Sequence, residues 1–143
     1  MATDIFNVFL VATVKDREDF SFDNFFLSLG LSLNEPNPAI SSFSSPHAGS
    51  SSRTCNICFC RLDMRHFEST VEYAEAQDLS INRCCDWLQE RVEALRTAQE
   101  RLKYTLYVEK FLSNRSGFTF PPKFVQICAD LNLTLDFDIY SSN

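Results

Sequence analysis

The sequence predicts an α+β protein with a small sheet, one long amphipathic helix and a structural zinc knuckle. Apolar, strand-like segments lie near both ends of the chain, and an apolar repeat of three and four residues indicates a helix between them. Five of the six cysteines fall in two groups. With 143 residues, 45% of them apolar, the chain is long enough for one domain with a modest core.

The first block, residues 1–35, is predicted to hold an apolar strand followed by a Phe-rich acidic segment. Residues 5–14 are rich in β-branched and aromatic side chains, which is typical of a buried strand. Ser21 is well placed to cap a short helix, and Gly30 to follow its end. A strand here and another near the C-terminus would share one sheet.

Residues 36–53 are predicted to be a linker, because they contain three prolines and seven serines. Ile40 and Phe43 are its only candidate anchors to a core. Two interpretations stay open for this segment. It is either a long surface loop or a separator that lets the N-terminal block move against residues 54–143.

Residues 54–143 are predicted to hold the zinc knuckle, the long helix and a C-terminal strand. The helix is expected from about Asp86 to Leu112, with a second, shorter helix after Pro121 and an alternating strand over residues 133–140. The apolar repeat of the long helix consists of Leu88, Val92, Leu95, Leu102 and Leu106. A helix of this length either covers a core or also serves self-association, so a homodimer through it is a further expectation.

The cysteines predict the metal site. Cys55 and Cys58 form a Cys-x2-Cys pair, a spacing at which a short turn brings two thiolates to one ion. Cys84 and Cys85 lie just before the predicted long helix, whose N-terminus would favour thiolates. His66 is a candidate fourth ligand.

The ligand set has open alternatives. Neighbouring cysteines cannot share the geometry of a Cys-x2-Cys turn, so only one of Cys84 and Cys85 would bind, with Cys60 or His66 completing the site. The competing interpretation is that the cysteines are small buried apolar side chains and exposed thiols. A redox-sensitive set of thiols is a third hypothesis.

Charge and motif content narrow the function classes. A net charge of −6 argues against generic binding to nucleic acid or to an anionic membrane, and no apolar run reaches the roughly 18 residues of a membrane span. The N-terminus lacks the basic start of a secretory signal, so disulfides are not expected. No catalytic motif is present, which favours a binding protein over an enzyme.

Basic residues are concentrated in the middle of the chain. Ten of the thirteen Lys and Arg lie between Arg53 and Arg115, together with ten acids. We expect most of them to pair on a solvated surface. Weak contact with RNA through arginines near the cysteines stays an alternative.

The layout resembles the protein of the first open reading frame of sobemoviruses. The matching features are an apolar N-terminal strand, the pair Cys55 and Cys58, the pair Cys84 and Cys85, and a charged helix over 86–110. The second pair here lacks the two-residue gap of that family. A weaker resemblance, to the zinc-knuckle early oncoproteins of papillomaviruses, covers only one of their half-domains.

The sobemovirus resemblance implies a suppressor of host RNA silencing that supports virus movement between cells, with structural zinc. Its partner would be a host silencing-pathway protein or RNA, in the host cytoplasm or nucleus. The acidic charge favours a protein partner. The alternative function is a zinc-dependent adaptor that recruits host ubiquitin-ligase machinery.

Overall fold

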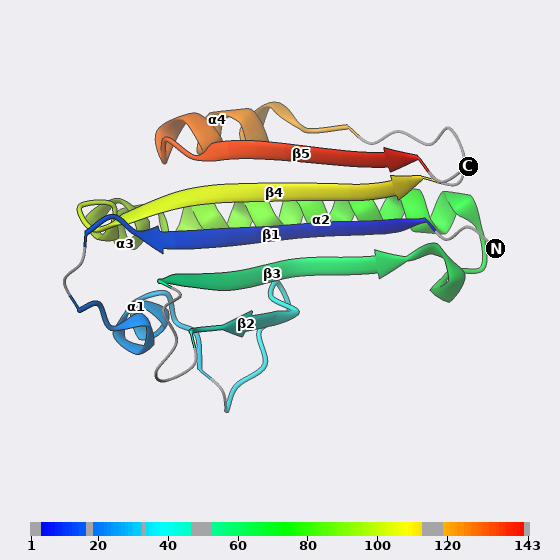
Figure 1. Cartoon of the computed structure of the whole chain (residues 1–143). Coiled ribbons are helices and arrows are strands. Elements are labelled where there is room, and N and C mark those ends of the chain that lie inside the picture. The colour runs from blue at the N-terminus through cyan, green and yellow to red at the C-terminus, as the bar shows by residue number, and fades with distance from the viewer. Residues whose placement is uncertain (1–3, 17–18, 33, 47–52, 113–118, 142–143) are drawn as a thin grey trace.

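The structure is a computed structural model that describes residues 4–16, 19–32, 34–46, 53–112 and 119–141. It confirms the α+β class, because five strands form one sheet in the order β2–β3–β1–β4–β5, accompanied by helices (Figure 1). The strands are β1 (Ile5–Val14), β2 (Ser42–Ser44), β3 (Thr54–Asp63), β4 (Leu102–Leu112) and β5 (Thr134–Ser141). The helices are α1 (Phe22–Ser28), α2 (Thr70–Glu90), α3 (Val92–Ala98) and α4 (Pro122–Asp130), with a 3-10 turn η1 (Met64–His66).

Strand β1 is the centre of the sheet and pairs antiparallel with both β3 and β4. The N-terminal block therefore supplies the strand that joins the two halves of the sheet. At one edge, β2 pairs antiparallel with β3, and at the other β5 runs parallel to β4. Helix α4 connects β4 to β5, as expected because parallel neighbours need a crossover.

The two faces of the sheet differ in what covers them. Side chains alternate along each strand, so the even-numbered residues of β1 and β4 share one face and the odd-numbered residues share the other. The even-numbered side chains are buried beneath the helices, and α2 runs behind β1 and β4 in Figure 1. No helix among the described segments lies over the other face, which we call the open face.

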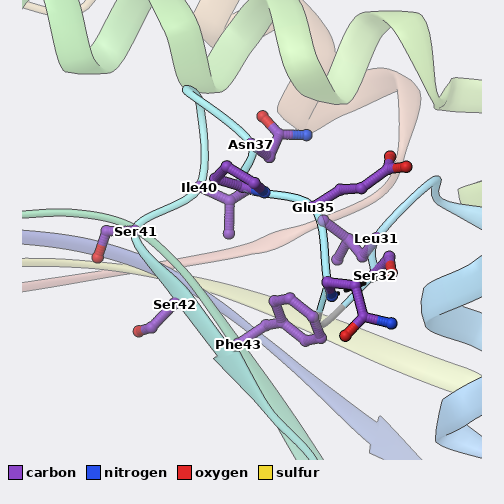
Figure 2. A pocket seen from close by; sticks show the side chains of 10 residues that line it. Leu31, Ser32, Glu35, Asn37, Ile40, Ser41, Ser42 and Phe43 are labelled. Carbon is purple, nitrogen blue, oxygen red and sulfur yellow. Dashed lines mark hydrogen bonds between the residues drawn. The ribbon is translucent and has the colours of Figure 1, made fainter.

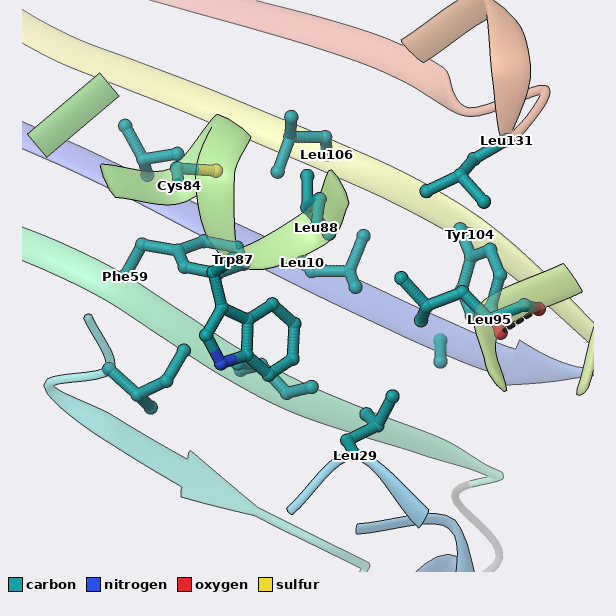
Figure 3. Close-up of a cluster of buried hydrophobic side chains, with 14 of the residues drawn as sticks. Leu10, Leu29, Phe59, Cys84, Trp87, Leu88, Leu95, Tyr104, Leu106 and Leu131 are labelled. Carbon is teal, nitrogen blue, oxygen red and sulfur yellow. Dashed lines mark hydrogen bonds between the residues drawn. The ribbon is translucent and has the colours of Figure 1, made fainter. Parts of the chain in front are cut away.

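The core lies between the sheet and α2. Trp87 packs edge-on against Phe59 of β3 at a ring-centroid distance of 5.4 Å, and Leu88 is fully buried beside it (Figure 3). Phe59 is the extra residue of a bulge in β3, because Cys58 pairs with Phe9 and Cys60 with Val8. The bulge lets Phe59 reach Trp87 while Cys60 also stays buried.

The predicted helix from Asp86 to Leu112 is wrong in its bounds. The long helix α2 ends at Glu90, the short helix α3 follows, and Leu102 begins strand β4. Leu88 and Leu95, expected on a helix stripe, are both fully buried in the core of this chain. A homodimer through the helix stays a prediction, and these leucines do not offer a surface for it.

Several local predictions are confirmed. Ser21 caps α1 by accepting a hydrogen bond from the Asn24 backbone N–H at 3.2 Å, and Gly30 follows the helix with a φ of +76°. Helix α4 and strand β5 also lie where the sequence predicted them. Both candidate anchors of the predicted linker are used, because Ile40 is buried and Phe43 of β2 packs edge-on against Phe26. Residues 47–52 of that linker lie outside the described segments.

Candidate functional site

Cys55 and Cys58 lie in strand β3 and not in a turn. Cys55 pairs with Ala12, on the face beneath the helices, whereas Cys58 pairs with Phe9, on the open face. Alternation along the strand therefore sends the two thiols to opposite faces of the sheet. The two sulfurs therefore do not face a common ion. The turn predicted at Cys55 and Cys58 is wrong, because strand β3 takes its place.

Cys84 and Cys85 lie in the last two turns of α2 and not at a helix start. Both are buried, Cys84 completely. His66 is exposed in η1, at the other end of α2 from the two cysteines. The favourable effect of a helix N-terminus on a thiolate is therefore absent at Cys84 and Cys85.

Burial keeps these thiols protonated. It raises the pKa of Cys55 to about 12 and that of Cys60 to about 11, and it holds the pKa of Cys84 well above the ordinary value of 9.0. Zinc binds the thiolate form, which burial disfavours. At neutral pH, these side chains behave as small apolar groups of the core.

The predicted ligands thus do not form one site in this arrangement. Within the described part of the chain, no group of three or more His, Cys, Asp or Glu side chains is placed to hold a metal ion. Cys60, the open alternative, lies on the same face as Cys55. It is close enough to Cys84 in the core for a charge on Cys60 to raise the pKa of the Cys84 thiol, as charges on Cys85 and Cys128 also would. Structural zinc stays a prediction of the sequence pattern.

The open face carries two stacked aromatic pairs on neighbouring strands. Phe9 of β1 stacks on Tyr107 of β4 at 5.0 Å between ring centroids, with 12° between the ring planes. Phe111 of β4 stacks on Tyr140 of β5 at 4.8 Å and 16°. Phe111 and Tyr140 are 37% and 47% exposed, so the second pair offers ring surface to a partner.

A polar row crosses the sheet between these aromatic pairs. Asn7 of β1, Glu109 of β4 and Asp138 of β5 occupy one register position, and we call them the carboxylate row. The register continues to Arg61 of β3. Neighbouring rows on one face lie about 7 Å apart, because successive residues of a strand rise about 3.3 Å and alternate between faces. Both aromatic pairs therefore border the carboxylate row.

Asn7 is the unusual member of this row. Its side chain is 8% exposed, and its Oδ1 atom has no hydrogen-bond partner among the described residues. A buried carbonyl oxygen without a donor costs free energy, on the order of 1–3 kcal/mol. The row thus contains an unused acceptor beside two carboxylates.

The open face is acidic as a whole. The charged side chains that its described strands carry comprise four carboxylates and two basic groups, and Arg65 of η1 adds a third basic group beside Asp63. The acids are Asp63, Glu109, Asp136 and Asp138, and the basic residues are Arg61 and Lys103. Asp63 is additionally held by Arg65, whose hydrogen bond lowers the pKa of that carboxyl to about 2. The remaining acids concentrate on β4 and β5.

A second polar cluster is buried beneath the sheet near the start of α2. Lys110 of β4 donates from Nζ to Oε1 of Gln77 at 2.8 Å, and the Tyr73 hydroxyl donates to Oδ1 of Asp4 at 3.1 Å. All four side chains are at most 2% exposed. Burial lowers the pKa of Lys110, whereas the Asp4 carboxylate acts in the opposite direction. The cluster satisfies these polar groups inside the core, without access for a substrate.

A hollow of about 370 Å³ lies beside β2 and the loop before it (Figure 2). Ile40, Leu31 and Phe43 supply apolar walls, and Glu35 and Asn37 supply polar groups. Among the described residues that line it, Glu35 is the only charged one, and none carries a buried side-chain polar atom without a hydrogen-bond partner. The hollow therefore gives no indication of a particular ligand.

Basic side chains are largely paired, as the sequence analysis expected. Arg53 and Arg101 both approach Asp16, at 4.0 and 3.3 Å, and Arg65 pairs with Asp63 at 2.7 Å. Arg91 packs over Trp87 and donates to the Leu29 carbonyl. These contacts use the arginines in the fold, which weakens the case for an RNA-binding patch near the cysteines.

Comparison with known proteins gives no relative: no family model, no curated protein and no solved structure matches the chain. None of the described helices is both long enough and apolar enough to cross a bilayer.

The sequence analysis missed the open face. Alternation in the segment that forms β4 was the available signal, with Tyr107, Glu109 and Phe111 between buried residues. That segment was assigned to the long helix, so its outward side chains were not grouped with those of β1 and β5.

Proposed function

We propose that this chain is a binding protein that acts on a protein partner through the open face of its sheet. The observation that carries the proposal is the pair of aromatic stacks, Phe9–Tyr107 and Phe111–Tyr140, on a face without a covering helix in the described segments. Aromatic side chains are enriched at protein interfaces, where they supply large contact areas at small entropic cost.

A protein partner is favoured over RNA. Aromatic rings on an open sheet can also stack on bases, but such sites combine the rings with a positively charged groove. Here the rings lie among carboxylates, and the net charge of the chain is −6. Phosphates would be repelled from this face.

More specifically, we propose that the chain suppresses host RNA silencing and supports cell-to-cell movement of a virus. What supports this narrower function is the order of sequence features that the chain shares with the sobemovirus family, namely the apolar N-terminal strand and the two cysteine pairs. The charged helix over 86–110 is not part of this support, because α2 ends at Glu90 and β4 begins at Leu102. The partner would be a host silencing-pathway protein, in the cytoplasm or the nucleus.

A leaf reporter assay tests this proposal. The chain is expressed together with a silenced fluorescent reporter, beside Tyr107→Ala on the open face and Val71→Ala on α2 as the matched control. Val71 is 64% exposed and lies on the helical side. We expect fluorescence to persist with the unmodified chain and with Val71→Ala and to be lost with Tyr107→Ala. Silencing that proceeds unchanged with the unmodified chain would contradict the suppressor proposal.

Direct RNA binding is tested separately by a mobility-shift assay with double-stranded RNA at low salt. The proposal predicts no shift. A shift that weakens steeply with added salt would contradict the proposal of a protein partner and would indicate that the chain binds RNA.

The open face is built by strand pairing, so the proposed function does not require a metal ion. Structural zinc on Cys55, Cys58, Cys84, Cys85 or His66 remains a prediction of the sequence alone. Ubiquitin-ligase recruitment depends on such a zinc module and has no separate support.

A further inference from the structure

We propose that the carboxylate row binds an arginine-bearing segment of the partner protein, with the guanidinium group held between the two aromatic stacks. This inference rests on the proposed function and names the chemistry of the partner. It combines three observations on the open face: paired carboxylates, an unused buried acceptor, and flat aromatic rings on both sides of them.

The first observation is the pairing of like charges. Glu109 and Asp138 are directly opposed on β4 and β5, and Asp136 follows one row away beside Tyr107. Like charges in opposed positions repel each other across a sheet. A cation placed over the row would remove this repulsion. It would also form charge-assisted hydrogen bonds with both carboxylates.

The second observation is the unpartnered acceptor. Asn7 Oδ1 lies in the same row, with the side chain 8% exposed and no donor among the described residues. An oxygen atom of this kind accepts a hydrogen bond from an N–H or O–H group and does not bind an anion. Because it is neutral, Asn7 extends the row without further repulsion between charges.

The third observation is the position of the rings. Phe9 and Tyr107 border the row on one side, and Phe111 and Tyr140 border it on the other. One face of each ring is occupied by its stacking partner. A guanidinium group presents several N–H donors in one plane and can pack on the ring surface that remains, beside the carboxylates. A lysine ammonium group lacks this planar fork, so the site should prefer arginine.

Arg61 limits the part of the row over which the guanidinium group of the partner can bind. It occupies the β3 end of the same register, next to Asn7, and adds positive charge there. The incoming guanidinium group is therefore expected over β4 and β5, where the acids lie, and not over β3. A partner segment along the β5 side would meet Asp136 and Asp138 in succession.

The test is fluorescence anisotropy with labelled octapeptides of alternating arginine and serine, and of alternating lysine and serine with the same charge. The full chain is compared with the double variant Glu109→Gln/Asp138→Asn. The matched control is Glu75→Gln/Asp78→Asn, which removes two exposed carboxylates from the outer face of α2. Net charge is then equal in the two double variants.

We expect the arginine peptide to bind the unmodified chain and the α2 control with similar affinity, and the row variant at least about tenfold more weakly. The lysine peptide should bind the unmodified chain several-fold more weakly than the arginine peptide. Tyr107→Leu should reduce the preference for arginine. Circular dichroism and urea unfolding of every variant show that a loss of binding does not come from unfolding.

Three results would overturn the inference. Equal losses in the two double variants would show a generic effect of net charge. Equal affinities for the arginine and lysine peptides would show that the aromatic rings do not select a guanidinium group. Tight binding of double-stranded RNA in place of either peptide would assign the face to nucleic acid.

The two proposals can fail separately. If the arginine peptide binds the row but the leaf reporter stays silenced, the silencing proposal fails and the arginine site stands. If the reporter stays fluorescent but the arginine peptide does not bind the row, only the arginine site is rejected.

Discussion

Glu109 and Asp138 stand directly opposite each other on β4 and β5, so two like charges share one register position of the sheet. Like charges in directly opposed positions destabilise the strands that carry them. The free energy lost here is what a bound cation would recover. The pair therefore links the stability of the sheet to its proposed function.

Neutralising one member of this pair should stabilise the free protein. We expect Asp138→Asn to raise the free energy of unfolding by up to about 0.5 kcal/mol, because the cross-strand repulsion is removed. Urea unfolding at low salt measures the difference, which should shrink at high salt through screening. A loss of stability would show that Asp138 has a favourable partner.

The buried cluster near the start of α2 gives a second prediction. Gln77→Leu removes the acceptor that lies 2.8 Å from Lys110 Nζ and should cost about 1–3 kcal/mol of stability. The double variant Gln77→Leu/Lys110→Met should lose less than the sum of the two single variants, because no buried ammonium group is left behind. Additive losses in urea unfolding would contradict this coupling.

Packing beneath the sheet gives a third prediction with a control on the same helix. Leu88 is fully buried, whereas Leu79 is 49% exposed. Leu88→Ala should lower the free energy of unfolding by about 2–5 kcal/mol through the lost burial and the cavity left behind. Leu79→Ala should change it by less than about 0.5 kcal/mol. Similar losses of stability in the two variants would show that Leu88 and Leu79 do not differ in burial, which would contradict the face of α2 that the structure packs against the sheet.

The buried thiols predict a loss of stability at alkaline pH. Burial raises the pKa of Cys55 to about 12 and of Cys60 and Cys128 to about 11, from an ordinary value of 9.0. Between pH 9 and the raised pKa of each thiol, the unfolded chain releases thiol protons that the folded chain retains. The stabilising contribution is therefore complete below pH 9 and is lost as the pH rises toward 11–12.

Each such thiol would contribute a slope of at most roughly 1.4 kcal/mol per pH unit in that interval. The pKa of Lys110 is lowered by burial, so its contribution has the opposite sign and offsets part of the loss. Urea midpoints from pH 7 to 10.5 measure the slope, and Cys60→Ala should make it shallower. A midpoint that rises with pH over this interval would contradict the burial of the thiols.

Metal analysis decides how the cysteines are used. With Cys55 and Cys58 on opposite faces of the sheet, we expect the purified chain to unfold at the same urea concentration with and without a chelator. Cys55→Ser should then act only through packing. One zinc ion per chain, lost together with the fold on chelation, would support the zinc knuckle and contradict this strand register.

Local signals in the sequence were sufficient for about half of the fold. The apolar run of β1, the Ser21 cap and Gly30 of α1, and the alternation of β5 each depend on neighbouring residues, and each was predicted correctly. These elements have strong short-range patterns, which tertiary structure did not override.

The segment from Leu88 to Leu106 was misassigned for a physical reason. Leu102 and Leu106 are four residues apart, a spacing that fits one face of a helix and also one face of a strand. The period of two becomes clear only when Tyr104 and Val108 are counted with them, and both are buried. Without β4, the open face could not be assembled from the sequence.

The cysteine pattern misled because spacing alone does not define a turn. Cys-x2-Cys fits a zinc knuckle, yet Cys55, Ile57 and Phe59 also alternate as a strand does. The bulge at Phe59 hides the alternation by placing Phe59 and Cys60, which are consecutive, both in the interior. Pairing with the distant strand β1 decides whether this segment forms a turn or a strand, and the spacing of the cysteines in the sequence contains no information about that pairing.

The most direct test of the open face as the binding surface is site-specific photo-crosslinking in leaf tissue that expresses the chain. A benzophenone side chain replaces Tyr107 on the open face or, in parallel, Val71 on the outer side of α2. We predict a discrete crosslinked protein from position 107, competed away by the arginine peptide, and none from position 71. Crosslinking from position 71 alone, or from neither position, would contradict the account.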